Sequence, residues 1–166
     1  MQNDRVPGMP FVSDCASSDK AVLLSFDVGV LAVFAKHIQR KARDCEAGGI
    51  LVGTVHEAGL LVKEASEPTG RDVRRQYFFE RTPFRHRALA RSRWRSSAGT
   101  MRYLGEWHTH PQDHPTPSAL DRAEWLQLAR KRADGRPMLA VIVGRCSMHV
   151  ELVPAKGGAT VLHPLV

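Results

Sequence analysis

The sequence contains little cysteine and no long hydrophobic run, and each absence narrows the class of protein. Its three cysteines, Cys15, Cys45 and Cys146, are odd in number and widely separated among 166 residues. Small secreted domains held by disulfides use an even and denser set, so a disulfide framework is not expected. No run of about 18 apolar residues occurs that could cross a membrane as a helix. These absences indicate a protein of a reducing compartment.

The beginning of the sequence also lacks the pattern of a secretory signal, because no basic segment is followed there by an apolar one. Residues 1–20 are polar, contain two prolines and are expected to form a flexible tail. Residues 21–166 show no repeat and no linker, and 43 % of the whole chain is apolar. This length and composition predict one folded domain with its own core, in a cytoplasmic protein.

The positive charge is concentrated in one block. Ten arginines stand against two acidic residues between residues 71 and 102, which gives this block +8 and leaves −1 for the rest of a chain whose net charge is +7. Such a block is compatible with nucleic acid, an acidic protein surface or an acidic tail as partner. A solvated, arginine-rich helix face explains it equally well.

Hydrophobic periodicity and turn residues predict a layered domain of strands and helices. Apolar runs predict strands at 21–26, 48–55, 59–66, 76–80, 101–110, 136–144 and 146–155. Helical patterns with plausible caps predict helices at 28–44, 82–99 and 118–135. In the first of these, the predicted apolar stripe comprises Val28, Leu31, Ala32, Ala35, Ile38 and Gln39. The order predicts an α/β (α+β) fold with a mixed sheet flanked by helices.

The stretch "GEWHTHPQDHPTPSALDRAEW", residues 105–125, contains most of the candidate site residues. His108 and His110 lie two residues apart at the end of a predicted strand, which places both imidazoles on one face, close enough to share a metal. A solvated strand edge would also explain this pair. Ser118 and Asp121 begin the next helix, where Ser-x-x-Asp is also an ordinary capping pattern. Two imidazoles and one carboxylate would leave a tetrahedral zinc one open position for water, as catalytic sites do.

These residues carry a family resemblance. The string His108-x-His110, seven residues, Ser118, two residues and Asp121 resembles the signature of JAMM (MPN+, JAB-type) zinc metallopeptidases. "EAGGILVG", residues 46–53, is similar to the upstream segment of that family and matches Glu46 to its glutamate. The resemblance implies a single JAMM/MPN domain with cytidine-deaminase-like layering. It also implies Zn²⁺ as cofactor, His108, His110 and Asp121 as ligands, Glu46 as general base and Ser118 as donor to the oxyanion.

The compact size and the strings "GEWHTHP" and "PTPSALDRAEW" most resemble the deconjugating peptidases of type II CBASS anti-phage operons. That resemblance implies a substrate with a flexible C-terminal tail, either a ubiquitin-like conjugate or a cGAS-like nucleotidyltransferase, joined by E1/E2 enzymes. The segment "RKRADGRP", residues 130–137, leaves little room for the second insertion of eukaryotic relatives. Selectivity for particular ubiquitin-chain linkages is therefore in doubt.

Three alternatives remain open at this point. A JAMM peptidase that trims a sulfur-carrier protein would use the same residues. A RadC-like, nucleic-acid-associated module would use the arginine block. A scaffold without catalysis is disfavoured because all five site positions are intact. Among other residues near the motif, Asp113 is a conceivable substitute ligand, His114 is expected at the surface, Cys45 is not expected to be a nucleophile, and Trp107 is expected in the core.

Overall fold

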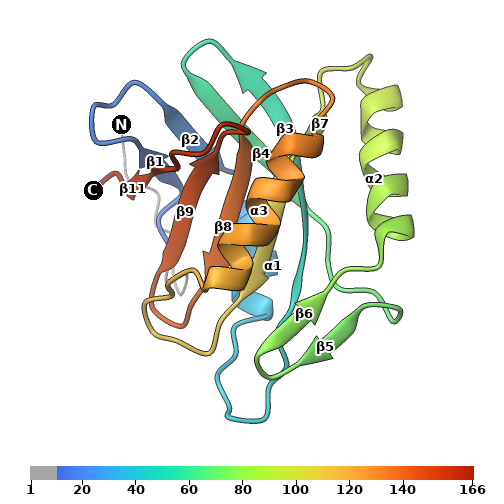
Figure 1. Ribbon diagram of the computed structural model, residues 1–166, viewed down its shortest axis with the longest axis vertical. Coiled ribbons are helices and arrows are strands. Elements are labelled where there is room, and N and C mark those ends of the chain that lie inside the picture. Colours follow the sequence, from blue (N-terminus) through green and yellow to red (C-terminus); the bar gives the residue numbers. More distant parts are fainter. Residues whose placement is uncertain (1–10) are drawn as a thin grey trace.

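The computed structural model describes residues 11–166, with the exception of the Phe84 side chain (Figure 1). Half of the predicted tail, residues 1–10, lies outside the described residues. The other half does not behave as a tail. Strand β1 (Asp14–Ala16) belongs to the main sheet, and Phe11, Cys15 and Ala16 are buried in the core. The predicted tail of residues 1–20 is therefore wrong for this part, because these apolar side chains pack against the domain.

One nine-stranded sheet organises the described part of the chain, in the order β10-β9-β8-β7-β3-β4-β2-β1-β11. Besides β1 it contains β2 (Leu23–Phe26), β3 (Gly48–His56), β4 (Gly59–Ala65), β7 (Arg102–Thr109), β8 (Met138–Val143), β9 (Met148–Val153), β10 (Thr160–Val161) and β11 (His163–Pro164). The pairs β2–β4 and β7–β8 are parallel and the others are antiparallel. The predicted mixed sheet is confirmed.

Helices cover both faces of this sheet. Figure 1 shows α3 (Ala119–Lys131) in front of β8 and α1 (Val28–Lys36) behind the sheet. The alternation of β8 explains why its six residues are all buried. Met138, Ala140 and Ile142 belong to the cluster beneath α3, and Leu139, Val141 and Val143 belong to the cluster that includes α1. The result is a three-layered α/β/α domain, which confirms the predicted fold class.

Two local predictions differ from the structure. The helix expected over 28–44 ends at Lys36. Beyond it, Gln39 is buried, and its side-chain amide donates to the carbonyl oxygens of Asp44 and Gln76 at 3.0 and 2.9 Å. These tertiary hydrogen bonds hold residues 37–47 in an irregular path. The buried face of α1 consists of Val30, Leu31 and Phe34, so the predicted stripe beginning at Val28 is shifted.

The segment before α2 (Pro83–Ser96) is more regular than expected. No strand was predicted over residues 67–75, but β5 (Val73–Arg75) pairs with β6 (Phe78–Glu80) in a small antiparallel sheet. This β5–β6 hairpin lies below the main sheet in Figure 1, next to the beginning of α3. No helix among the described residues has the length and apolar character that a bilayer crossing requires.

Candidate active site

Strand β7 carries the two histidines into a central position of the sheet. His108 pairs with Gly48 of β3 on one side and with Ile142 of β8 on the other. Because paired residues of neighbouring strands face the same side, His108 faces α3 like Ile142. Its ring lies 6.1 Å from the ring of Trp125, a buried residue of α3. His110 follows one residue after the strand ends, and its backbone N–H donates to the Val143 carbonyl.

The first turn of α3 adds a carboxylate to this pair. His108 Nε2 lies 3.0 Å from His110 Nε2 and 3.2 Å from Asp121 Oδ1, and His110 Nε2 lies 3.4 Å from Asp121 Oδ2. Ligand atoms of a tetrahedral zinc at 2.0–2.1 Å are separated by about 3.3 Å. The three side chains therefore fit a metal of this size, and they are the His/Asp group that could hold an ion among the described residues.

Asp121 is held in place by the helix cap. Its Oδ2 accepts a hydrogen bond of 2.7 Å from the Ser118 backbone N–H, and its own N–H donates to Ser118 Oγ at 3.1 Å. Burial raises the pKa of Asp121, but hydrogen bonds from His108 and His110 outweigh burial and bring the pKa far below its ordinary value. The carboxylate is thus ionised, as a ligand must be. Asp121 therefore belongs both to the predicted capping pattern and to the predicted set of metal ligands.

Gln112 orients His110 and was not predicted. Its Oε1 lies 3.2 Å from His110 Nδ1 and accepts a hydrogen bond of 3.1 Å from the Thr116 backbone N–H. In neutral His110 the proton then stands on Nδ1, which leaves Nε2 free for a metal. The backbone carbonyl of Gln112 accepts a hydrogen bond from the backbone N–H of Arg145, so the loop is also tied to the turn between β8 and β9. A glutamine two residues after H-x-H could have been found as a partner for the second ring nitrogen.

Glu46 reaches the same place from the segment that leads into β3, the strand next to β7. It is 6 % exposed and lies two residues before the start of β3, which pairs with the histidine strand. Its backbone N–H donates to the Arg75 carbonyl at 2.7 Å, and its carbonyl accepts from Arg74 Nε at 2.9 Å. Strand β5, which the sequence did not predict, therefore fixes the backbone of Glu46. Burial raises the pKa of Glu46 to about 7, while the charges of His110 and Asp121 act in opposite directions.

A buried polar chain connects the Glu46 segment to the histidine strand. Thr109, between the two histidines, points away from them and is fully buried. Its Oγ1 accepts from the Ala47 N–H at 3.0 Å and donates to Gln39 Oε1 at 2.9 Å. Gly48 follows, and a Cβ there would lie 2.5 Å from the Trp107 carbonyl oxygen. The small residues after Glu46 thus allow β3 to lie close to the histidine strand.

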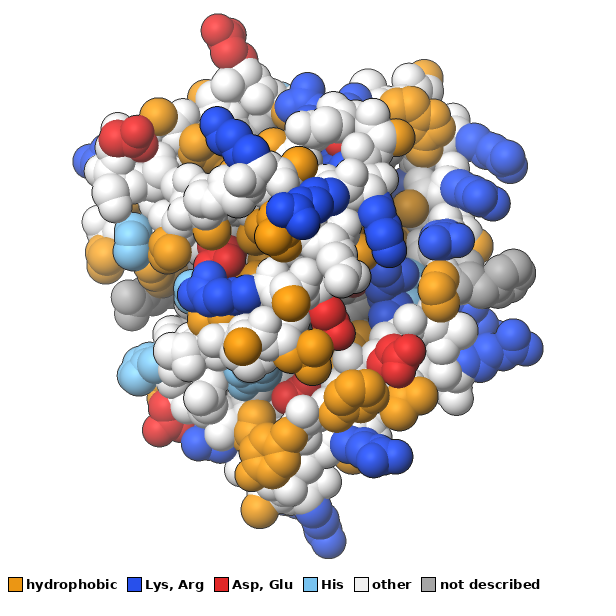
Figure 2. Space-filling model, viewed as in Figure 1, with side chains coloured by type: hydrophobic (Ala, Val, Ile, Leu, Met, Phe, Trp, Pro, Cys, Tyr) orange, Lys and Arg blue, Asp and Glu red, His pale blue; other side chains and the backbone are white. Residues whose placement is uncertain are grey.

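The side chains of the candidate site line one cleft of about 830 Å³. Glu46, His108, His110, Ser118 and Asp121 all contribute to its wall. The β5–β6 hairpin supplies Tyr77, Phe78 and Phe79 on one side, and α3 supplies Leu120, Trp125 and Leu128 on the other. Figure 2 shows apolar and acidic side chains together where α3 faces the hairpin. The five residues selected from the sequence are therefore brought together in one cleft.

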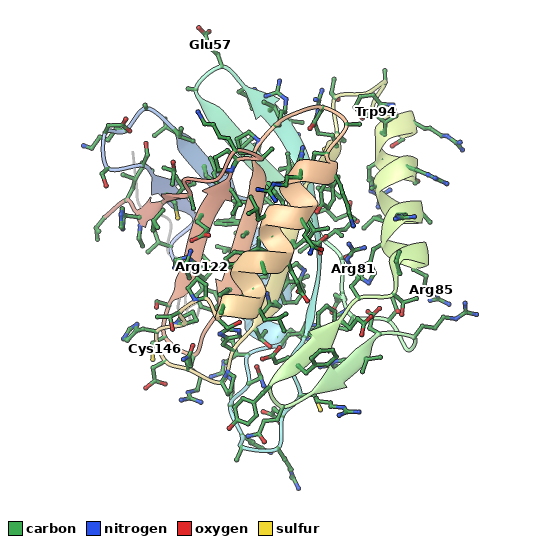
Figure 3. The ribbon with its side chains drawn as sticks, in the orientation of Figure 1. Glu57, Arg81, Arg85, Trp94, Arg122 and Cys146 are labelled. Carbon is green, nitrogen blue, oxygen red and sulfur yellow. The ribbon has the colours of Figure 1, made fainter. Side chains whose placement is uncertain are left out.

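An ion pair that was not predicted from the sequence forms part of the cleft. Glu106 lies two residues before His108 in β7 and therefore on the same face of the strand. Both of its carboxylate oxygens accept from Arg81, at 3.0 and 2.7 Å, and Oε1 also accepts from the Tyr103 hydroxyl at 2.8 Å. Arg81 follows β6 directly and lies between α2 and α3 in Figure 3. This pair connects the β5–β6 hairpin to the histidine strand.

Among the remaining residues near the motif, His114 and Trp107 lie where they were expected, whereas Asp113 does not join the ligand group. Asp113 accepts from Arg145 Nε at 2.7 Å and is absent from the ligand group. His114 is exposed and pairs with Ser147 Oγ. Trp107 is buried and donates to the Ser66 carbonyl, and Cys45 is exposed.

Comparisons with known proteins give a matching family and similar relatives. Residues 27–154 match the family of prokaryotic homologues of the JAB domain. A Pseudomonas aeruginosa protein named CD-NTase/cGAS isopeptidase is 51 % identical over 157 residues, covering 95 % of this chain and 99 % of the relative. A protein of the same name from Vibrio cholerae is 41 % identical over 100 residues, covering 60 % of this chain and 62 % of the relative.

Among solved structures, protein DSY2949 from Desulfitobacterium hafniense has a similar fold, with a TM-score of 0.59 and 20 % identity over 83 % of this chain and 88 % of that one. The names of the relatives agree with the resemblance inferred from the motif strings. The family match covers most of the chain and includes every residue of the candidate site. The chain therefore belongs to the prokaryotic JAB-domain family.

Proposed function

We propose that this protein is a zinc-dependent isopeptidase that hydrolyses the bond after the C-terminus of a conjugated protein. The observation that supports this most is the convergence of His108, His110 and Asp121 in a cleft that Glu46 and Ser118 also line. Two imidazoles and one carboxylate suit zinc and leave a position open, as in catalytic sites. When bound, the ion would polarise the scissile carbonyl and lower the pKa of a water molecule.

Glu46 acts as the general base and then as the general acid. Its carboxylate accepts a proton from the attacking water and delivers it to the amine that leaves. Both roles need a pKa near the working pH, because the group must take up and release the same proton. Burial raises the pKa of Glu46 to about 7, which suits this exchange. The backbone contacts with Arg74 and Arg75 hold the carboxylate at the wall of the cleft.

Ser118 stabilises the tetrahedral intermediate. Its Oγ accepts a hydrogen bond from the Asp121 N–H, and this leaves the hydroxyl proton available for another acceptor. The exposed side chain lies in the wall of the cleft. We assign to it a hydrogen bond to the oxyanion that forms when the carbonyl carbon is attacked.

The substrate is an extended C-terminal tail. A tail can enter the cleft between the β5–β6 hairpin and α3, where aromatic and aliphatic side chains line both walls. The relatives are named CD-NTase/cGAS isopeptidases. We therefore propose a cGAS-like nucleotidyltransferase as the conjugated protein and E1/E2 enzymes as the source of the conjugate. The reaction would reverse that conjugation during anti-phage defence.

A substrate trap tests this function. Tagged Glu46→Ala and wild-type proteins are expressed in the native host, and mass spectrometry identifies the conjugates that accumulate with the variant alone. A nucleotidyltransferase joined through its C-terminus to other molecules is the expected result. A small carrier protein ending in Gly-Gly would contradict the proposed substrate and indicate a biosynthetic peptidase. Absence of any trapped conjugate, in cells that make one, would contradict the isopeptidase function.

A further inference from the structure

Polar contacts join the described side chains of helix α2 to the domain. Among its described side chains, His86 is the buried one, and no apolar residue of α2 belongs to the buried core. His86 Nδ1 lies 2.6 Å from Ser66 Oγ, and Nε2 lies 3.1 Å from Asp72 Oδ2. Arg93 adds a two-pronged ion pair with Glu64, at 2.6 and 3.0 Å. These contacts use one side of the helix and leave its other side to solvent.

The outer side of α2 carries exposed arginines. Arg87, Arg91 and Arg95 follow one another at intervals of four residues, and all three are exposed, as is Arg85 near the start of the helix. In the described part of the chain, none of these four has a carboxylate oxygen within 4.0 Å. Figure 2 shows basic side chains along the edge of the molecule formed by α2. We call these four residues the α2 arginine face.

The composition of α2 makes this face unlike an ordinary solvated helix surface. The helix contains no Asp or Glu that could pair with the arginines along its length. Like charges four residues apart destabilise a helix. Arg87, Arg91 and Arg95 are spaced by roughly 6 Å along the axis, since each residue of a helix rises 1.5 Å, and Arg85 lies about 3 Å before Arg87. This arrangement suits a ligand that brings several negative charges in a row.

An aromatic ring adjoins the same face. Trp94 is 49 % exposed, and its ring lies 5.4 Å from the guanidinium carbon of Arg102. Figure 3 places Trp94 near one end of α2 and Arg85 near the other. The indole therefore offers a stacking surface beside the guanidinium groups. Stacking surfaces next to a basic stripe are typical of proteins that bind single-stranded nucleic acid.

We propose that the α2 arginine face binds the sugar–phosphate backbone of nucleic acid. Guanidinium groups bind phosphate through paired hydrogen bonds, and a helix with charge of one sign makes no selection among sequences. An acidic protein would be a poorer fit, because protein interfaces use aromatic and apolar anchors at their centre, whereas Trp94 is the exposed large apolar side chain described on α2. The sequence pI of about 9.8 is in the range of such domains.

This surface is separate from the candidate active site. The metal-ligand group lies on β7 and at the start of α3, and α2 stands apart from α3 in Figure 1. Binding should therefore not require a metal, and loss of binding should not abolish peptidase activity. These two expectations distinguish the inference from the proposed function, because either can fail while the other holds.

The test measures fluorescence anisotropy of labelled 20-nucleotide DNA, single-stranded and duplex, at several salt concentrations. Wild-type protein is expected to bind in the micromolar range, with a logarithmic salt slope of about −3 to −4 for four phosphate contacts. Replacing Arg85, Arg87, Arg91 and Arg95 by Ala should weaken binding at least tenfold and bring the slope near zero. Trp94→Ala should weaken single-strand binding more than duplex binding.

The matched control removes four exposed charges elsewhere. Changing Arg40, Lys41, Arg43 and Lys156 to Ala gives the same net charge and should leave the affinity within about threefold of wild type. EDTA should not change binding, and circular dichroism should show that all variants are folded. The inference is overturned if the two quadruple variants lose affinity equally, if wild type does not bind DNA at 50 mM salt, or if polyglutamate binds α2 while DNA does not.

Discussion

Ser118 and Asp121 hold one another across the first turn of α3, with the Ser118 N–H on Asp121 Oδ2 and the Asp121 N–H on Ser118 Oγ. The same carboxylate lies 3.2 Å from His108 and 3.4 Å from His110. Helix capping and metal binding therefore require the same geometry of Asp121. As a consequence, the structure of the helix start presets the proposed third ligand.

The first prediction separates the two roles of Ser118. Ser118→Ala removes the cap and the hydroxyl donor, so it should lower the free energy of unfolding by about 1 kcal/mol and kcat by about 10²-fold. Ser118→Thr keeps a hydroxyl and should retain most of both. Denaturant unfolding and steady-state kinetics measure the two effects. A kcat unchanged in Ser118→Ala would remove Ser118 from the mechanism.

The second prediction concerns the general base. Glu46→Gln preserves the size of the side chain but cannot accept a proton, so kcat should fall by about 10²–10⁴-fold. Metal content, measured by mass spectrometry of the purified protein, should remain near that of wild type. His108→Ala is the comparison, because it should lose the metal together with the activity. Equal loss of metal in both variants would make Glu46 a ligand instead of a base.

The third prediction follows from the pKa of Glu46, which burial raises to about 7. A general base works when it is deprotonated, so kcat/KM should rise with pH and level off above the pKa. A bound cation favours the carboxylate, and the midpoint should therefore lie at or below pH 7. The pH profile of the wild type gives the midpoint. A rate that falls as pH rises from 5 to 7 would contradict the assignment.

The fourth prediction concerns Gln112, whose Oε1 accepts from His110 Nδ1 at 3.2 Å. Gln112→Ala removes the group that fixes the protonated ring nitrogen, and zinc affinity should weaken by about 10–100-fold. Gln112→Glu keeps an acceptor at the same place and should restore the affinity. Competition with a zinc-binding dye measures both. Wild-type affinity in Gln112→Ala would show that His110 is oriented by other contacts.

Much of the candidate site could be predicted from local spacing. The two histidines share a face because residues two apart in a strand do so, and Ser118 and Asp121 meet because they are three apart at a helix start. The central strand and α3 were also predicted from their own patterns. Each of these relationships depends on neighbouring residues in the chain.

The rest depends on contacts between distant segments. The support of Glu46 by Arg74 and Arg75 joins residues about thirty positions apart, and the Arg81–Glu106 pair joins residues 25 apart. Strands β1, β10 and β11 have two or three residues, too few to show an alternation. The end of α1 at Lys36 is determined by the buried hydrogen bonds of Gln39, which leave no local mark in the sequence.

Hydrolysis of a purified conjugate tests the central claim most directly. A nucleotidyltransferase joined through its C-terminus to an acceptor amine is incubated with metal-free protein, and zinc is then added in steps. Intact nucleotidyltransferase should be released with its full C-terminus, in proportion to zinc up to one equivalent, and Asp121→Ala should release none. Release that is equally fast without zinc, or an intact conjugate at full zinc occupancy, would contradict the account.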